Sequence, residues 1–137
     1  GYSSTAGTSG NYSTAGTSGY SSTAGTSGYS STAGTSGDYS TAGTSGNRST
    51  AGTSGYSSTA AATGAYCRAK ADGKDSIAVA NGAHSRARGA MGCYIVLTEY
   101  GDDGSMICAK MTRVDGSFIK ENVWYTLENG EFVEADA

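Results

Sequence analysis

The chain has 137 residues, no proline, 22 glycines and a formal net charge of −3, and 15% of its residues are charged. This charge content lies below the ~25% of an average soluble protein, and the acidic balance argues against a general nucleic-acid binder. No run of 18 apolar residues occurs, so the sequence predicts no membrane span.

The segment 1–90 repeats a nine-residue unit, Gly-Tyr-Ser-Ser-Thr-Ala-Gly-Thr-Ser, which continues in degraded form past Gly82. Self-similarity at a fixed period is typical of solenoids, because each unit stacks on its neighbours. A flexible Gly/Ser/Thr linker needs neither a strict period nor a recurring tyrosine. The repeat therefore predicts an ordered solenoid domain over residues 1–90.

Alternate positions of the unit indicate which side chains face inward. Position 4 is serine or Cys67, position 6 is always alanine, and position 8 is Thr, Ala or Gly, so these small residues fit the inner face of a strand. Positions 5 and 7 must face outward, because they hold the charged pairs Arg68/Lys70 and Arg86/Arg88. Positions 9 to 3 form the turn, where the position-1 glycine supplies backbone freedom. We expect an all-β fold, a thin parallel β-solenoid (β-roll) of about ten nine-residue coils.

Three sets of outward residues are candidate functional surfaces. A flat strip of threonine and glycine is expected to let copies pack laterally. It consists of Thr5, Gly7, Thr14, Gly16, Thr23, Gly25, Thr32, Gly34, Thr41, Gly43, Thr50 and Gly52. The second set is a tyrosine ladder, expected to stack along one edge. It consists of Tyr2, Tyr12, Tyr20, Tyr29, Tyr39, Tyr56 and Tyr66.

The third set is a basic belt made of Arg68, Lys70, Arg86 and Arg88. Residues 91–137 carry three basic and nine acidic side chains, so they form an acidic segment. Opposite charges favour docking. We therefore expect the basic belt to contact the acidic segment, either in its own chain or in a neighbouring one.

The segment Asp75–Gly89 reads Asp-Ser-Ile-Ala-Val-Ala-Asn-Gly-Ala-His-Ser-Arg-Ala-Arg-Gly. Its Ser-x-Ala-x-Gly pattern resembles the head repeats of YadA-type trimeric autotransporter adhesins, closely over residues 64–90 and in pattern over residues 1–63. The resemblance implies a parallel left-handed β-roll. The C-terminal segment resembles uncharacterised domains that close such arrays in bacterial and phage proteins, a resemblance that implies no activity.

Residues 91–137 are predicted to form a second unit of antiparallel β-structure. Apolar runs at 93–100, 105–114, 123–127 and 131–133 are separated by Gly-Asp-Asp-Gly, Asp-Gly and Asn-Gly turns. Asp-Gly and Asn-Gly between apolar runs are strong hairpin signals. Because the end of a solenoid exposes unpaired edge groups, we expect this unit to cap it.

The sequence holds no recognisable catalytic constellation. The repeat frame places His84, the only histidine, above Asp75 as a surface pair, while the nearby serines face inward. Asp102 and Asp103 offer far fewer oxygens than the six to eight that calcium takes. We therefore expect a non-enzymatic protein without cofactor or metal.

The three cysteines, Cys67, Cys93 and Cys108, lack the paired spacing of a zinc site. We expect buried free thiols, with one disulfide and a leftover thiol as the alternative.

Three functions remain open. The leading hypothesis is a structural, self-assembling β-solenoid that forms a filament, fibre or surface spike of bacterial or phage origin, with itself as partner. The outward threonine file also suits an ice-binding protein, and a phage-encoded protein acting on a host factor is the third. Localisation is not readable from the sequence, although the extracellular space or a virion surface is favoured.

The chain starts in repeat phase at Gly1, which indicates a processed or truncated product. An uncapped first coil would expose edge groups, so head-to-tail growth onto the C-terminal segment of the next copy is expected.

Overall fold

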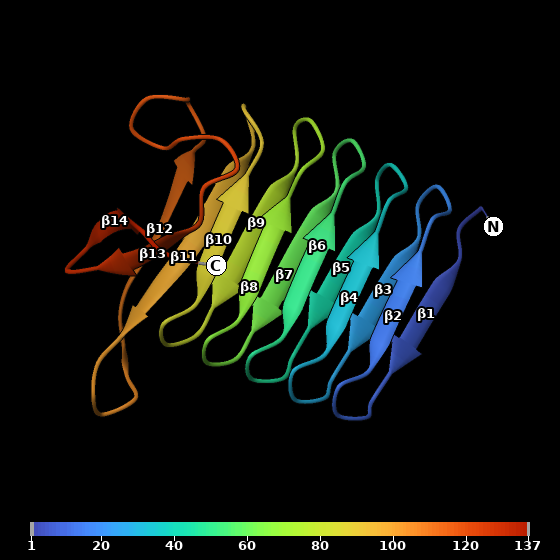
Figure 1. Ribbon diagram of the computed structural model, residues 1–137, viewed down its shortest axis with the longest axis horizontal. Helices are drawn as coiled ribbons and strands as arrows, with labels where there is room; N and C mark the ends of the chain where they lie inside the picture. The colour runs from blue at the N-terminus through green and yellow to red at the C-terminus, as the bar shows by residue number, and fades with distance from the viewer. Residues whose placement is uncertain (1, 137) are drawn as a thin grey trace.

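The computed structural model describes residues 2–136, which form strands and turns and no helix. The strands make two sheets of seven that lie face to face (Figure 1). Sheet A contains, in spatial order, β1 (Thr5–Thr8), β3 (Thr23–Thr26), β5 (Thr41–Thr44), β7 (Thr59–Thr63), β9 (Ile77–Asn81), β11 (Tyr94–Tyr100) and β12 (Met106–Arg113). Sheet B contains β14 (Glu131–Glu134), β13 (Tyr125–Glu128), β10 (Arg86–Gly89), β8 (Arg68–Ala71), β6 (Thr50–Thr53), β4 (Thr32–Thr35) and β2 (Thr14–Thr17).

One turn of the solenoid takes two repeats, which corrects the expectation of ten nine-residue coils. Thr5 pairs with Thr23 in sheet A, and Thr14 pairs with Thr32 in sheet B, so partners lie 18 residues apart. Successive repeats alternate between the two sheets, and the solenoid has about five turns. At about 4.8 Å per turn, the repeats span about 24 Å, roughly half the length that ten coils would give.

The turns depend mainly on position 3 of each repeat, and among residues 2–136 the glycine freedom expected at position 1 is used at Gly64 and Gly82, with φ of 129° and 158°. Position 3 is left-handed in every repeat although it never holds glycine, with φ of 52° at Ser30 and 59° at Arg48. Position 1 is glycine because backbones meet there: a Cβ on Gly37 would lie 2.0 Å from the carbonyl oxygen of Gly19. Close approach between successive turns, which only glycine allows, therefore explains the position-1 file.

The interior is built from small residues in hydrogen-bonded files, as the sequence predicted for positions 4, 6 and 8. The position-6 alanines from Ala15 to Ala87 are buried. Within residues 2–136, six inward serine amides donate to the serine hydroxyl one turn ahead, as Ser40 N does to Ser58 Oγ at 3.0 Å. The serine hydroxyl in turn donates to a glycine carbonyl, as Ser58 Oγ does to Gly37 O at 3.2 Å. These files satisfy buried polar groups inside a core too thin for large side chains.

Position 8 departs from this pattern of satisfied groups. The inward threonine hydroxyls are buried and have no hydrogen-bond partner within residues 2–136. They belong to Thr8, Thr17, Thr26, Thr35, Thr44 and Thr53. An unpaired buried hydroxyl costs free energy, so these positions limit the stability of the repeats.

Two C-terminal hairpins extend the two sheets at the end opposite β1 (Figure 1). β11 adds in parallel to β9, with Ile95 paired to Ala78, and β12 returns antiparallel to it. β13 contacts β10 through the pair Ala87 and Tyr125, and β14 returns along β13. The predicted Asn129-Gly130 hairpin turn is present, with φ of 51° and 77°. Ile95, Leu97 and Val114 supply the largest fully buried side chains.

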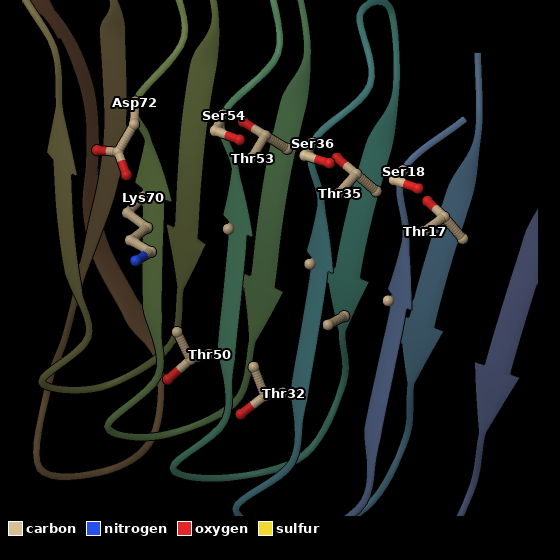
Figure 2. Close-up of a pocket in the computed structure, with 14 residues that line it drawn as sticks. Thr17, Ser18, Thr32, Thr35, Ser36, Thr50, Thr53, Ser54, Lys70 and Asp72 are labelled. Carbon is tan, nitrogen blue, oxygen red and sulfur yellow. The ribbon is translucent and has the colours of Figure 1, made fainter. Parts of the chain in front are cut away.

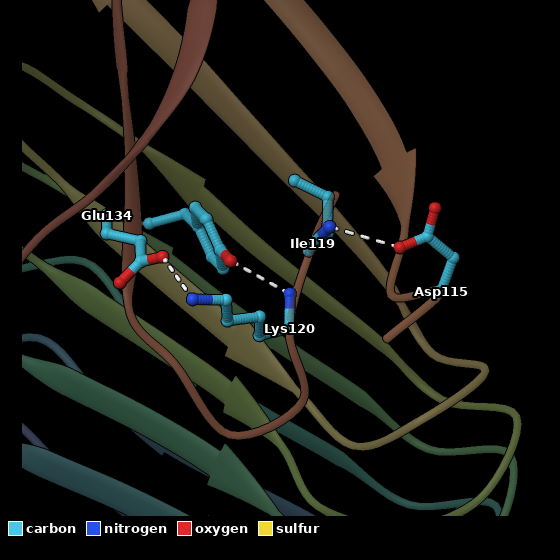
Figure 3. A network of polar contacts seen from close by, with 5 residues as sticks. Asp115, Ile119, Lys120 and Glu134 are labelled. Atoms are coloured by element: carbon cyan, nitrogen blue, oxygen red, sulfur yellow. Dashed lines mark hydrogen bonds and ion pairs between the residues drawn. The ribbon is translucent and has the colours of Figure 1, made fainter. Parts of the chain in front are cut away.

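The loop between β12 and β13 is held by polar contacts (Figure 3). Asp115 Oδ1 accepts hydrogen bonds from the amides of Ser117 and Ile119 at 2.9 and 3.1 Å. The Lys120 amide donates to the Tyr125 hydroxyl at 2.8 Å, and Lys120 Nζ pairs with Glu134 at 3.2 Å. Ile119 is thereby fixed in its buried position.

Candidate functional site

The predicted assembly strip divides between two opposite faces, because alternate repeats belong to different sheets. The outer face of sheet A, here face A, carries Thr5, Gly7, Thr23, Gly25, Thr41 and Gly43. The outer face of sheet B, here face B, carries Thr14, Gly16, Thr32, Gly34, Thr50 and Gly52. Each face therefore has half of the residues that the sequence placed on one.

Face B is hollowed along the glycine file into a trough of about 630 Å³ (Figure 2). Its floor is Gly16, Gly34 and Gly52, whose missing side chains create the depression. Thr32 and Thr50 line one side, while Ser18, Ser36 and Ser54 line the other. At the C-terminal end, Lys70 and Asp72 close the trough. The trough is a regular array of hydroxyl groups with a charged end.

The basic belt lies on face B beside this trough. Arg86 pairs with Arg68, and Arg88 pairs with Lys70, on the adjacent strands β10 and β8. Like charges directly opposite each other are destabilising. Arg88 is compensated by Asp72 at 3.8 Å and by the Trp124 ring at 5.2 Å.

The expected contact between the belt and the acidic segment is not made by ion pairs within the chain. Among residues 2–136, the belt's ion pair is Arg88 with Asp72, and the acidic segment's is Lys120 with Glu134. Arg88 meets the acidic segment only through Trp124. Arg86 lines a cleft together with glutamates of the acidic segment, and all four belt residues are half-buried on face B.

The tyrosines form two ladders on opposite edges, where the sequence predicted one. On one edge, Tyr2 stacks on Tyr20 at 5.1 Å between ring centroids, and the file continues through Tyr39 and Tyr56. Stacked and edge-on aromatic contacts of this kind contribute about 0.5–1.5 kcal/mol per pair. The tyrosines of this ladder all come from odd-numbered repeats.

The second edge mixes aromatic and cationic residues. Tyr12 meets Tyr29 edge-on at 6.1 Å, Arg48 lies 4.9 Å over the Tyr66 ring, and Tyr66 stacks on His84 at 5.1 Å. This stacking corrects the placement of His84 above Asp75, because those residues belong to adjacent repeats and hence to opposite edges. His84 is a member of the ladder.

A smaller cleft of about 340 Å³ lies between the end of the solenoid and the C-terminal hairpins. His84 and Arg86 line it together with Glu99, Glu128 and Glu134. The Glu99 carboxylate accepts hydrogen bonds from the backbone amides of Asn129 and Gly130. Glu99 therefore helps to hold the β13–β14 hairpin in place at this cleft.

All three cysteines are free, and two occupy serine positions of the inner file. Cys67 Sγ donates to Gly46 O, and Cys93 Sγ donates to Gly73 O. Burial raises the pKa of the Cys67 thiol, with hydrogen bonds from the Ser49 and Arg48 backbone opposing this. Cys67 is thus held as a neutral thiol, unsuited to nucleophilic chemistry. Within residues 2–136 no group of three or more potential metal ligands is found.

Sequence reasoning missed the exposed apolar surface at the C-terminal end. Ile107, Met111 and Phe118 are 63%, 61% and 89% exposed, although large apolar side chains between hairpin turns ordinarily indicate burial in a core. β12 has β11 on one side and no strand of residues 2–136 on the other. An edge strand with apolar side chains was detectable only once the end of the sheet was known.

Comparisons with protein-family models, with curated proteins and with solved structures find no match to this chain. Residues 2–136 contain no helix long and apolar enough to cross a membrane.

Proposed function

We propose that this protein is a non-enzymatic, self-assembling structural β-solenoid that forms a filament, fibre or surface spike of bacterial or phage origin. The observation that carries the proposal is the open edge of β12, whose outer side pairs with no strand of residues 2–136. Such edges template the addition of further strands unless charge, proline or a covering element blocks them. β12 carries Lys110, whose ammonium is bound to the Gly130 carbonyl, and Arg113 at its end, while the exposed Met106, Ile107 and Met111 favour addition of another chain there.

Within the described residues, β1 forms the opposite edge of sheet A. β1 pairs only with β3 within residues 2–136. Thr23 N donates to Ser4 O, so Ser4 and Ala6 direct their backbone groups toward β3, and Thr5 and Gly7 direct theirs outward. Pairing of β1 in one copy with β12 in the next would join copies end to end, a heterologous contact that makes open fibres.

The direct test is electron microscopy of the whole chain at rising concentration, where filaments are expected. Thr5→Pro removes one outward amide and should shorten the filaments several-fold, because proline cannot donate a hydrogen bond. Thr5→Val keeps both the amide and the branched shape and should leave filament length unchanged. Equal length distributions for the two variants would rule out end-to-end pairing.

A second candidate function is ice binding through face B. The observation that favours it is the trough of Figure 2, where threonine and serine hydroxyls repeat once per turn on both sides of the glycine floor. A regular hydroxyl array can order water in a repeating pattern. Recrystallisation inhibition should then be lost in Thr32→Lys and kept in Thr41→Lys, since Thr41 lies on face A.

A further inference from the structure

Face A is nearly free of charge along the whole solenoid. One outward file runs Thr5, Thr23, Thr41, Thr59, Ile77, Tyr94 and Arg113 across the seven strands. The other runs Gly7, Gly25, Gly43, Ala61, Val79, Val96 and Met111. Arg113 is the single charged member of the two files, whereas the same positions on face B hold the basic belt.

Side-chain size grows steadily along the second file. It starts with three glycines, passes through Ala61 at the middle strand, and ends with two valines and Met111. The large end is exposed to solvent, with Tyr94 at 41% and Met111 at 61%. The face is therefore a wedge, low at β1 and high at β12.

A two-fold axis parallel to the strands through β7 makes this wedge self-complementary. Among residues 2–136, β7 is the central strand of sheet A, so an axis there lays β1 on β12, β3 on β11 and β5 on β9 of a second copy. Gly7 then meets Met111, Gly25 meets Val96, and Ala61 meets itself. In this file each large side chain faces a glycine, while in the other file Ile77, Tyr94 and Arg113 face the smaller threonines, so large residues meet small ones across the contact, as in packed sheets.

The corresponding axis on face B would be unfavourable. β8 is the central strand of sheet B, so a two-fold axis there places Lys70 on Lys70 and Arg68 on Arg68 of the second copy. Like charges brought together cost free energy unless they are compensated. The charge pattern thus directs self-association to face A.

We infer that face A is the lateral contact of the self-assembly proposed above, on which this contact rests, and that its occupant is a second copy of the chain related by this two-fold axis. Seven strands about 4.8 Å apart and about four residues long give a face of about 29 by about 13 Å. That is roughly 400 Å² of flat surface on each copy, below the ~800 Å² per partner of a standard interface. The contact is therefore weak by itself, and dissociation in the micromolar range or above is expected.

Matched glycine substitutions on the two faces test the contact. A Cβ on Gly25 or on Gly34 would meet only the next backbone oxygen, at 3.8 and 3.7 Å, so both positions accept a side chain. Gly25→Val fills the low end of the wedge and should weaken self-association at least tenfold in sedimentation equilibrium. Gly34→Val makes the same change on face B and should leave the association constant unchanged. Equal constants for wild type and Gly25→Val, or equal weakening by both variants, would overturn the inference.

A compensating pair tests the register. Gly25 of one copy is expected to face Val96 of the other, so Gly25→Val combined with Val96→Ala should regain most of the lost affinity. Val96→Ala alone should weaken binding slightly. A double variant no better than Gly25→Val would contradict the proposed axis.

Disulfide trapping gives an independent readout in a Cys108→Ser background. Gly7→Cys with Met111→Cys places two thiols at opposite ends of one face, about 29 Å apart in one chain, so a bond between them must join two copies. Rapid covalent dimer formation is expected, and Gly25→Cys with Met111→Cys should cross-link much more slowly. Equal rates would overturn the register.

These results separate the lateral contact from the filament proposal. Filaments unchanged in Gly25→Val would remove the lateral contact and leave end-to-end assembly standing. A trapped dimer from a chain that never forms filaments would support the lateral contact and remove the filament proposal.

Discussion

Gly28 lies against the backbone of Gly10, one turn earlier, so closely that a Cβ on Gly28 would sit 2.0 Å from the Gly10 carbonyl oxygen. Backbone cannot move aside as a flexible side chain can. Gly28→Ala should therefore cost about 3 kcal/mol of unfolding free energy or more. Chemical denaturation would measure it.

The matched control is Gly34→Ala, whose Cβ would meet Gly52 O at an ordinary 3.7 Å. Alanine restricts the unfolded chain more than glycine, so this variant should gain about 0.5–1 kcal/mol. Equal losses for both variants would show that the close approach does not control stability.

A second prediction concerns the left-handed residue of each turn. Ser30 has φ of 52°, a region that costs non-glycine residues roughly 1–2 kcal/mol. Ser30→Gly removes this strain but adds chain entropy, and a net gain of about 0.5 kcal/mol is expected. Ser36→Gly, at an exposed position where φ is not left-handed, should instead lose about 0.5–1 kcal/mol. A loss in both variants would refute the strain argument.

The sequence predicted which side chains face inward but not how many residues make one turn. Inward and outward positions follow from period-two alternation, which is local. The turn length is not local, because a repeat of identical units places the same residues at 9 and at 18 residues' distance. Only the later repeats break this symmetry: Arg68/Lys70 and Arg86/Arg88 surround the apolar pair Ile77/Val79. That alternation of charged and apolar pairs indicates that successive repeats lie on two different faces. The division of the tyrosines between two edges follows from the same alternation.

The candidate surfaces were only partly predictable for the same reason. With a period of 18 residues, the assembly strip divides into face A and face B. The neighbour of His84 is then Tyr66, and not Asp75. The exposure of Ile107 and Phe118 had no sequence signal, since apolar residues between hairpin turns ordinarily indicate a core. Ile107 lies on the edge strand β12 and Phe118 in the loop that follows it, and that the sheet ends there is a property of the whole fold.

The unpaired threonine hydroxyls of the interior give a third prediction. Thr44 is 5% exposed, and its Oγ1 has no partner within residues 2–136. Thr44→Val keeps the shape and removes the unpaired hydroxyl, so the free energy of unfolding should rise by about 1 kcal/mol. Thr41→Val, on the exposed side of the same strand, should change stability by less than about 0.5 kcal/mol. A destabilised Thr44→Val would mean that an ordered water satisfies the hydroxyl.

The inner serine file gives a fourth prediction. Cys67 stands where the other repeats place a serine hydroxyl that accepts an amide, and thiols are weaker acceptors. Cys67→Ser should restore the file and gain about 0.5–1.5 kcal/mol. The reverse change, Ser58→Cys, should lose a similar amount, because Ser58 Oγ accepts the Ser40 amide. If both substitutions destabilise, the size of the cavity controls these positions, and hydrogen bonding does not.

The last prediction concerns acid sensitivity of the loop between β12 and β13. Hydrogen bonds from the amides of Ser117 and Ile119 lower the pKa of Asp115 below its ordinary value of 3.8. A carboxyl group whose pKa is lower in the folded state stabilises that state above the unfolded pKa, and the contribution is lost as pH falls through the folded pKa. The loop should therefore loosen only under strongly acidic conditions, below about pH 4. Amide hydrogen exchange at Ile119 would measure the loosening.

Asp115→Asn keeps an acceptor oxygen but removes the charge that these amides favour. Protection at Ile119 should then fall at neutral pH and lose its dependence on pH between about 2 and 5, because asparagine does not titrate. Asp102→Asn is the control, since that carboxylate contacts neither amide. A variant Asp115→Asn that keeps the wild-type pH profile would show that other carboxyl groups control the acid response. In that case Glu134, which anchors Lys120 in the same network, is the next group to replace (Figure 3).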